Sequence, residues 1–90
     1  MEIVLNSCFG GFSLSKIACK KLGLINPYAP IERTDSRLIE CVRTLGEEAN
    51  GNCAKLRIVE IPNDCTDWEI NDYDGVETIT YVVGGQLYHI

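Results

Sequence analysis

The residues best equipped for chemistry form a glycine-rich loop near the N-terminus: Asn6, Ser7, Cys8, Phe9, Gly10, Gly11, Phe12 and Ser13. The loop follows a short apolar run and precedes apolar residues at helical spacing, so we expect it to join a strand to a helix capped by Ser13. Backbone N–H groups at a helix start can face an anion, and glycines permit a close approach. The loop has neither the Gly-Lys-Ser/Thr ending of a Walker loop nor a G-x-G-x-x-G pattern, which excludes an ATPase or dinucleotide-binding assignment on motif grounds.

Aromatic and arginine side chains extend this candidate anion site. Phe9 and Phe12 are either core residues or platforms on which a base could stack. Tyr28 lies between two prolines in an extended connection that could bend over a ligand. Arg33 and Arg37 flank the start of the second expected helix, where each guanidinium could bind a phosphate or pair with a neighbouring carboxylate. We therefore take the loop residues, Tyr28 and both arginines as candidate ligand-binding residues.

The chain has few residues suited to catalysis or metal binding. The five cysteines include no C-x-x-C pair, and the single histidine is His89. A catalytic Cys–His pair would need His89 beside Cys8, and paired carboxylates occur only in the acidic last third of the chain. We expect no catalytic residues, no metal and no cofactor, and most cysteines to be small buried residues in a reducing compartment.

The charge is unevenly distributed along one expected domain, residues 1–90. Thirteen acidic and eight basic residues give a net charge of −5, which argues against general binding of DNA, RNA or anionic membranes. Residues 1–57 carry eight basic and six acidic side chains, a net of +2, whereas residues 58–90 carry seven acidic side chains and no lysine or arginine. The acidic third is either a solvated rim or a contact for a basic partner. With no long apolar run and no signal-peptide pattern, we expect a soluble cytoplasmic protein.

Apolar periodicity and turn residues predict the elements that position these groups. We expect a buried strand over 2–6, a helix of about ten residues ending at Gly23, and a second helix capped by Asp35 that can extend a turn beyond Gly46. Strands follow over 54–61, 68–70, 76–83 and 86–90, with turns at Asp74-Gly75 and Gly84-Gly85.

This order predicts an α+β fold, with two helices packed on one face of a small sheet. The sheet would comprise the N-terminal strand and a C-terminal antiparallel meander, and the first strand could pair in parallel with a later one. An unpaired strand at the C-terminal edge favours a homo-oligomer.

Much of the chain resembles a widespread family of small, mostly uncharacterised bacteriophage proteins that begin with a strand and a CFGGF-like loop. The resemblance lies in residues 3–15, 33–35, 45–51, 56–62 and 68–77. Residues 24–32 are shorter than the equivalent segment of many members, and residues 80–90 depart from the pattern. Small phage proteins often inhibit host antiviral defence, and some sequester a nucleotide second messenger within a small oligomer.

The resemblance therefore implies a phage anti-defence protein in the host cytoplasm, a non-catalytic sponge for a nucleotide-type immune signal. Its phosphate would bind at Gly10-Gly11-Phe12-Ser13, and its base at Phe9, Phe12 or Tyr28. One alternative is a protein-binding inhibitor of a host or defence protein that uses the acidic C-terminal hairpin. Another is an enzyme that degrades the signal.

Overall fold

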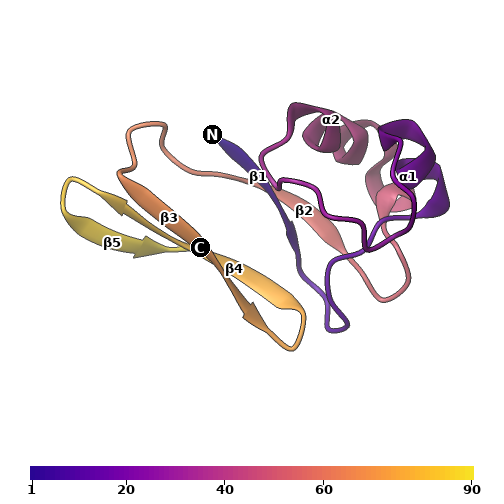
Figure 1. The fold of residues 1–90 in the computed structure, drawn as a ribbon. Coiled ribbons are helices and arrows are strands. Elements are labelled where there is room, and N and C mark those ends of the chain that lie inside the picture. The colour runs from indigo at the N-terminus through magenta and orange to yellow at the C-terminus, as the bar shows by residue number, and fades with distance from the viewer.

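The computed structural model describes residues 1–90 as three stacked layers, with the helices on one side of a two-stranded sheet and a three-stranded sheet on the other (Figure 1). The strands are β1 (Glu2–Asn6), β2 (Leu56–Glu60), β3 (Asp67–Tyr73), β4 (Val76–Val83) and β5 (Gln86–His89). The helices are α1 (Lys16–Leu22) and α2 (Ser36–Leu45), followed directly by the short 3₁₀ helix η1 (Gly46–Ala49). The expected α+β class and the two-helix count are confirmed.

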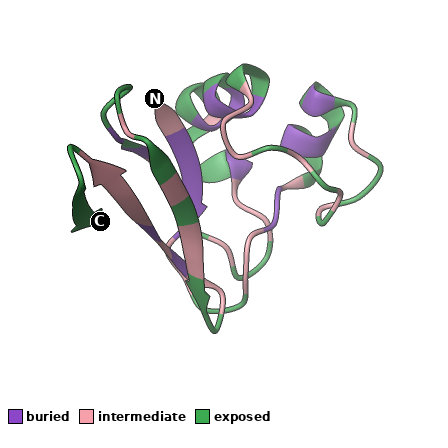
Figure 2. Cartoon of the chain, turned by 60° about the vertical axis from the view of Figure 1, so that its left-hand side comes forward, coloured by how far each residue is buried: buried purple, intermediate pink, exposed green.

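The central layer is the antiparallel pair β1 and β2, in which Val4 lies opposite Ile58. Side chains alternate across a strand, so Val4 packs among the helices whereas Ile3 and Leu5 face the three-stranded sheet. All three side chains are fully buried, as expected for a strand covered on both faces (Figure 2). The parallel pairing that the sequence allowed does not occur. The strands divide between two sheets, because β2 pairs with one edge of β1 and, on the other edge, the N–H groups of Val4 and Asn6 donate to the Arg33 carbonyl and the Glu77 carboxylate.

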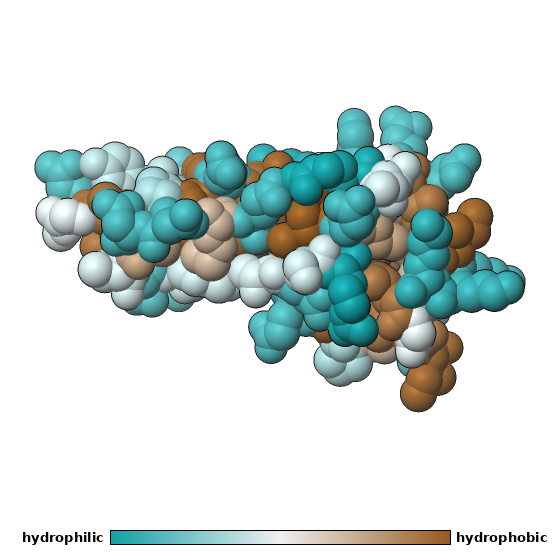
Figure 3. All heavy atoms as spheres, turned by 90° about the horizontal axis from the view of Figure 1, so that it is seen from above, coloured by the Kyte–Doolittle hydropathy of each residue, from teal (hydrophilic) through white to brown (hydrophobic).

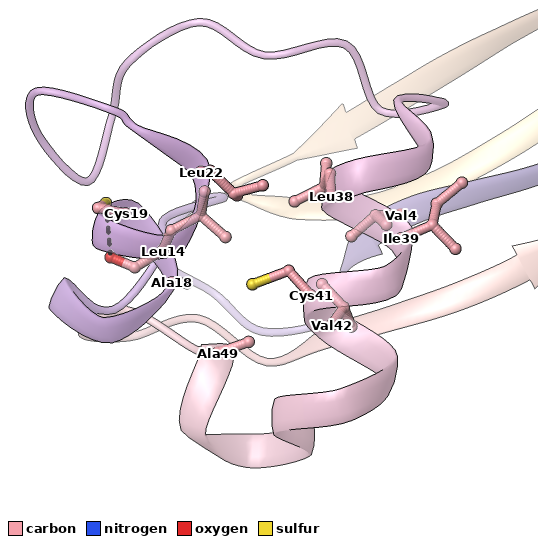
Figure 4. Close-up of a cluster of buried hydrophobic side chains, with 10 residues drawn as sticks. All are labelled: Val4, Leu14, Ala18, Cys19, Leu22, Leu38, Ile39, Cys41, Val42 and Ala49. Carbon is pink, nitrogen blue, oxygen red and sulfur yellow. Dashed lines mark hydrogen bonds between the residues drawn. The ribbon is translucent and has the colours of Figure 1, made fainter.

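The helical layer encloses the larger apolar cluster (Figure 4). Its ten buried members are Val4, Leu14, Ala18, Cys19, Leu22, Leu38, Ile39, Cys41, Val42 and Ala49. Asp35 caps α2 through a hydrogen bond from the Arg37 N–H (2.8 Å), as predicted from the sequence. Gly23 ends α1 in the left-handed conformation, which glycine adopts without steric cost, as also predicted.

Helix α1 is shorter than expected and has a different cap. Ser15, not Ser13, is its N-cap, accepting a hydrogen bond from the Ala18 N–H (3.1 Å). The helix cannot start earlier because Leu14 forms an isolated β-bridge with Asn50. Consequently α1 has seven residues, Cys19 is buried, and Ile17, expected on the buried face, is half exposed.

The three-stranded sheet is an antiparallel meander in the order β3, β4, β5. Its inner face contributes Ile79 to a second cluster with Ile3, Leu5, Val59 and Ile61, and Trp68 and Tyr81 pack against that cluster. All four residues of the two-residue turns Asp74-Gly75 and Gly84-Gly85 have positive φ, which is the geometry of type I′ hairpins. The sequence predicted a turn at both positions. The end of the sheet farthest from the helices projects from the body, and the face of it seen in Figure 3 carries mainly hydrophilic and intermediate residues.

Candidate functional site

The glycine-rich loop is tied to the hairpin turn between β3 and β4 by buried Asn6. The Asn6 side-chain amide donates hydrogen bonds to the carbonyl oxygens of Cys8 (2.7 Å) and Gly75 (2.6 Å). Its side-chain oxygen accepts one from the Lys55 N–H (2.8 Å). The Ser7 hydroxyl donates to the Lys55 carbonyl at 2.8 Å. Asn6 and Ser7 therefore hold the loop in place and have little capacity left for a ligand.

Glycines allow the loop and the turn to meet backbone to backbone. The Gly10 N–H donates to the Asp74 carbonyl at 3.2 Å, and a Cβ at Gly75 would collide with the Gly11 nitrogen. A Cβ at Gly10 would lie 2.6 Å from the Cβ of Cys53. These glycines make room for the chain itself, which is the physical reason for the glycine-rich composition here.

Ser13 does not face a ligand. It is 1% exposed, and its hydroxyl donates to the Asn52 carbonyl at 3.2 Å. Because α1 begins at Lys16, the loop does not lead directly into a helix N-terminus. The predicted phosphate position against a helix start at Gly10-Gly11-Phe12-Ser13 is therefore wrong in its geometry.

Arg33 is the centre of the polar network near the loop. Its guanidinium lies over the Phe12 ring, 3.7 Å from the ring centroid, and makes a bidentate pair with the Glu77 carboxylate at 2.5 and 2.8 Å. Glu77 is 4% exposed and also accepts a hydrogen bond from the Asn6 N–H (2.8 Å). Arg33 further donates to the Val4 carbonyl at 3.3 Å, and its own carbonyl accepts from the Val4 N–H. This network covers the edge of β1 that β2 leaves free.

Three of the candidate residues meet in one hollow of about 260 Å³. Phe12 comes from the loop, whereas Tyr28 and Arg33 come from the extended connection before α2; Ala29, Pro30 and Ile31 complete the lining. Tyr28 is 70% exposed. The connection therefore bends beside the loop, which brings together an accessible aromatic ring, a guanidinium and apolar walls.

The remaining candidates lie apart from this hollow. Phe9 is exposed and lines none of the hollows described, and it is not a core residue. Arg37 pairs with Asp35 at 3.1 Å, and this contact holds the pKa of the Asp35 carboxyl below its usual value. Arg37 also lines a separate hollow of about 440 Å³ beside Lys21 and Cys41, between α1 and α2.

The cysteines only partly match the expectation of burial. Cys19 and Cys41 are buried, and burial raises the pKa of the Cys41 thiol. Cys8 and Cys65 are partly exposed, and Cys53 is exposed with a φ of 64°. Cys53 lies in the turn that brings the chain back toward the loop, which places it at the surface. No group of three or more histidine, cysteine or acidic side chains could hold a metal ion.

Almost all acidic side chains of the last third are exposed. Glu77 is the exception: the sequence pattern grouped it with the acidic rim, but it is buried against Arg33. Its position in a strand of β-branched and aromatic residues, on the same face as Ile79 and Tyr81, was the available sign of burial. Trp68 was also missed: it lines a hollow of about 380 Å³ that shares Pro30, Ile31 and Arg33 with the first.

Comparison with known proteins supplies no relative: the chain matches no family model, no curated protein and no solved structure. None of its helices has the length and apolar character required to cross a membrane.

Proposed function

We propose that the protein binds a nucleotide-type immune signalling molecule without converting it, as a phage anti-defence sponge in the host cytoplasm. The supporting observation is the hollow that gathers Phe12, Tyr28 and Arg33 from two separate segments. An aromatic ring for a base beside a guanidinium for a phosphate is the combination that nucleotide recognition requires. The phage and anti-defence parts of the proposal depend on the family resemblance.

In this proposal the base stacks on exposed Tyr28. One face of Phe12 is already occupied by Arg33, so Phe12 acts mainly as a wall that orients the guanidinium. Base–aromatic stacking contributes about 1–3 kcal/mol per base. The hollow, at about 260 Å³, is below the roughly 300–1,000 Å³ of sites that enclose a whole drug-sized ligand. It therefore accommodates part of a nucleotide, and the rest extends over the surface.

In this proposal the phosphate binds Arg33 rather than the backbone N–H groups of the loop. Three hydrogen bonds, one to Val4 and two to Glu77, use three of the five guanidinium N–H donors. Two donors remain for a phosphate oxygen. Glu77 neutralises the charge of Arg33, so recognition relies on directed hydrogen bonds more than on long-range attraction.

Calorimetry against cyclic and ADP-ribose-type nucleotides tests binding. We expect Tyr28→Ala to weaken the affinity about 5- to 150-fold, the equivalent of 1–3 kcal/mol. Tyr73→Ala is the matched control, because Tyr73 is similarly exposed, at 75%, but lies at the end of β3 and does not line the hollow. Absence of binding at high micromolar nucleotide, or equal losses in both variants, would refute the proposal.

A release assay separates binding from catalysis. The protein is incubated with the nucleotide that binds, washed, denatured, and the released small molecule is identified. Intact ligand in stoichiometric amount supports a sponge. A converted product supports the signal-degrading enzyme instead.

The acidic hairpin supports a second candidate function, an inhibitor that contacts a basic host or defence protein. Every acidic side chain after Arg57 except Glu77 is exposed, and there is no nearby lysine or arginine in this part of the chain. The double variant Asp72→Asn and Asp74→Asn removes two charges while preserving the turn, because asparagine retains an acceptor for the Gly75 N–H and tolerates positive φ. Loss of a stoichiometric partner from host lysate in this variant, with nucleotide binding absent, would favour this function.

A further inference from the structure

The two outer strands of the three-stranded sheet differ in their protection against pairing with another chain. β3 carries the exposed carboxylates of Asp67, Glu69 and Asp72, whereas β5 carries no acidic residue and no lysine or arginine. Charged side chains on an edge strand disfavour pairing with another edge. The β3 edge is therefore protected by charge and the β5 edge is not.

The backbone of β5 presents hydrogen-bonding groups outward. Ile79 and Ile90 exchange both hydrogen bonds, at 3.1 and 2.9 Å, which fixes the phase of the β4–β5 ladder. Hydrogen-bonded residues alternate along an antiparallel strand, so the N–H and C=O groups of Leu87 and His89 point away from β4. β5 is the last strand of its sheet, and all four residues are exposed (Figure 2).

Apolar side chains accompany these free backbone groups. Leu87 is 71% exposed, Tyr88 42% and Ile90 37%. Tyr88 stacks on Tyr81 of β4, with ring centroids 5.4 Å apart and an interplanar angle of 17°, so the ring is already held on one face of the sheet. The edge thus combines open hydrogen-bonding groups with exposed apolar side chains.

We propose that β5 pairs antiparallel with β5 of a second copy of this chain, about a two-fold axis at Tyr88, to form a continuous six-stranded sheet. In this register Leu87 of each copy exchanges hydrogen bonds with His89 of the other, giving four bonds, and the two Tyr88 residues face each other. The two strands bring no like carboxylates together, whereas two β3 edges would. The proposal does not depend on nucleotide binding.

Sedimentation over a range of concentrations tests the pairing. A four-residue strand makes an interface below the roughly 1,200 Å² typical of stable complexes, so we expect a reversible monomer–dimer equilibrium. Leu87→Pro removes an outward N–H from each copy without breaking the β4–β5 ladder, and Leu87→Glu gives β5 the charge protection of β3. Both should raise the dimer dissociation constant about tenfold or more. Ile25→Glu, at a 96% exposed loop residue, is the matched control and should dimerise normally.

Cross-linking tests the register independently. Facing residues of a non-hydrogen-bonded antiparallel pair have Cβ atoms about 4.5–5.5 Å apart, so Tyr88→Cys, with the native cysteines replaced by alanine, should form an interchain disulfide under mild oxidation. Gln86→Cys in the same background should not, because it lies opposite Ile90 of the second copy. A monomer up to about 1 mM protein, a dimer insensitive to Leu87, or an assembly larger than two would each overturn the proposal.

Discussion

The two sides of β1 are stabilised differently. On the helical side, ten buried residues, all apolar or cysteine, form a continuous core. On the hairpin side only five buried apolar residues meet, and beside them lies the ion pair of Arg33 and Glu77. A small apolar cluster buries less surface and contributes less stability. The attachment of the three-stranded sheet therefore depends on one polar network to a degree that the helical side does not.

Removing Glu77 should destabilise the hairpin side of β1 more than any other change proposed here. Glu77→Ala leaves Arg33 without its carboxylate and the Asn6 N–H without its acceptor. Loss of one partner of a buried pair costs about 3–5 kcal/mol, which denaturant unfolding measures. Replacing both partners by apolar residues, Arg33→Met with Glu77→Leu, should recover part of that loss, because no unpaired charge stays buried, whereas the Asn6 N–H still lacks its acceptor. A cost below about 1 kcal/mol for Glu77→Ala would mean that the pair is unimportant.

Matched truncations of one core residue on each side of β1 should show whether the two sides unfold separately. Leu38 and Ile79 are both fully buried, one on each side of β1. Each truncation to alanine should cost about 2–4 kcal/mol. We expect Leu38→Ala to accelerate hydrogen exchange throughout the protein, whereas Ile79→Ala should accelerate it mainly in β3, β4 and β5 while the helices stay protected. Equal patterns in the two variants would show that both sides unfold as one unit.

Glycine substitutions at the two hairpin turns should give a smaller effect. Gly75 and Gly84 both have positive φ, and the αL conformation costs a non-glycine residue about 1–2 kcal/mol. Only at Gly75 would the new Cβ also collide with the loop backbone. Thermal unfolding should therefore show a larger loss for Gly75→Ala than for Gly84→Ala. Similar losses would argue that the loop and the turn are not held together.

The smallest effect concerns pH and the start of α2. Hydrogen bonds from Arg37 lower the pKa of the Asp35 carboxyl in the folded state. The ionised Asp35 carboxylate therefore contributes to the stability of the fold above its unfolded pKa of about 3.9. This contribution is lost as the pH falls through the lower pKa of the folded state. Asp35→Asn keeps a side-chain oxygen for the cap but should abolish this acid-side loss of stability, which thermal unfolding between neutral and acidic pH measures.

The fold could be predicted where local signals determine it. The burial of Ile3, Val4 and Leu5, the caps at Gly23 and Asp35, and the two hairpin turns depend on neighbouring residues, and all are confirmed. The pairing of β1 with β2 depends on residues fifty or more positions apart. Local periodicity does not specify such a choice, so the division into two sheets could not be read from the pattern.

The candidate site was predicted in its composition but not in its arrangement. Phe12, Tyr28 and Arg33 do meet, whereas Asn6, Ser7 and Ser13 are used by hydrogen bonds to other segments. The backbone N–H groups of a glycine-rich loop can donate hydrogen bonds either to a bound anion or to another segment of the same chain. The distinction required the position of the hairpin turn, which packs against the loop from more than sixty residues away.

The central position of β1 also has a consequence for biosynthesis. β1 precedes β2 and Glu77, which complete its two edges, by about fifty and seventy residues. Until then Ile3, Val4 and Leu5 form an unpaired apolar segment with strong β-propensity. Completion of both edges of β1 therefore waits until these residues have left the ribosome, and contacts of such long range are slow to form. During that interval the nascent chain is most exposed to aggregation and to capture by chaperones.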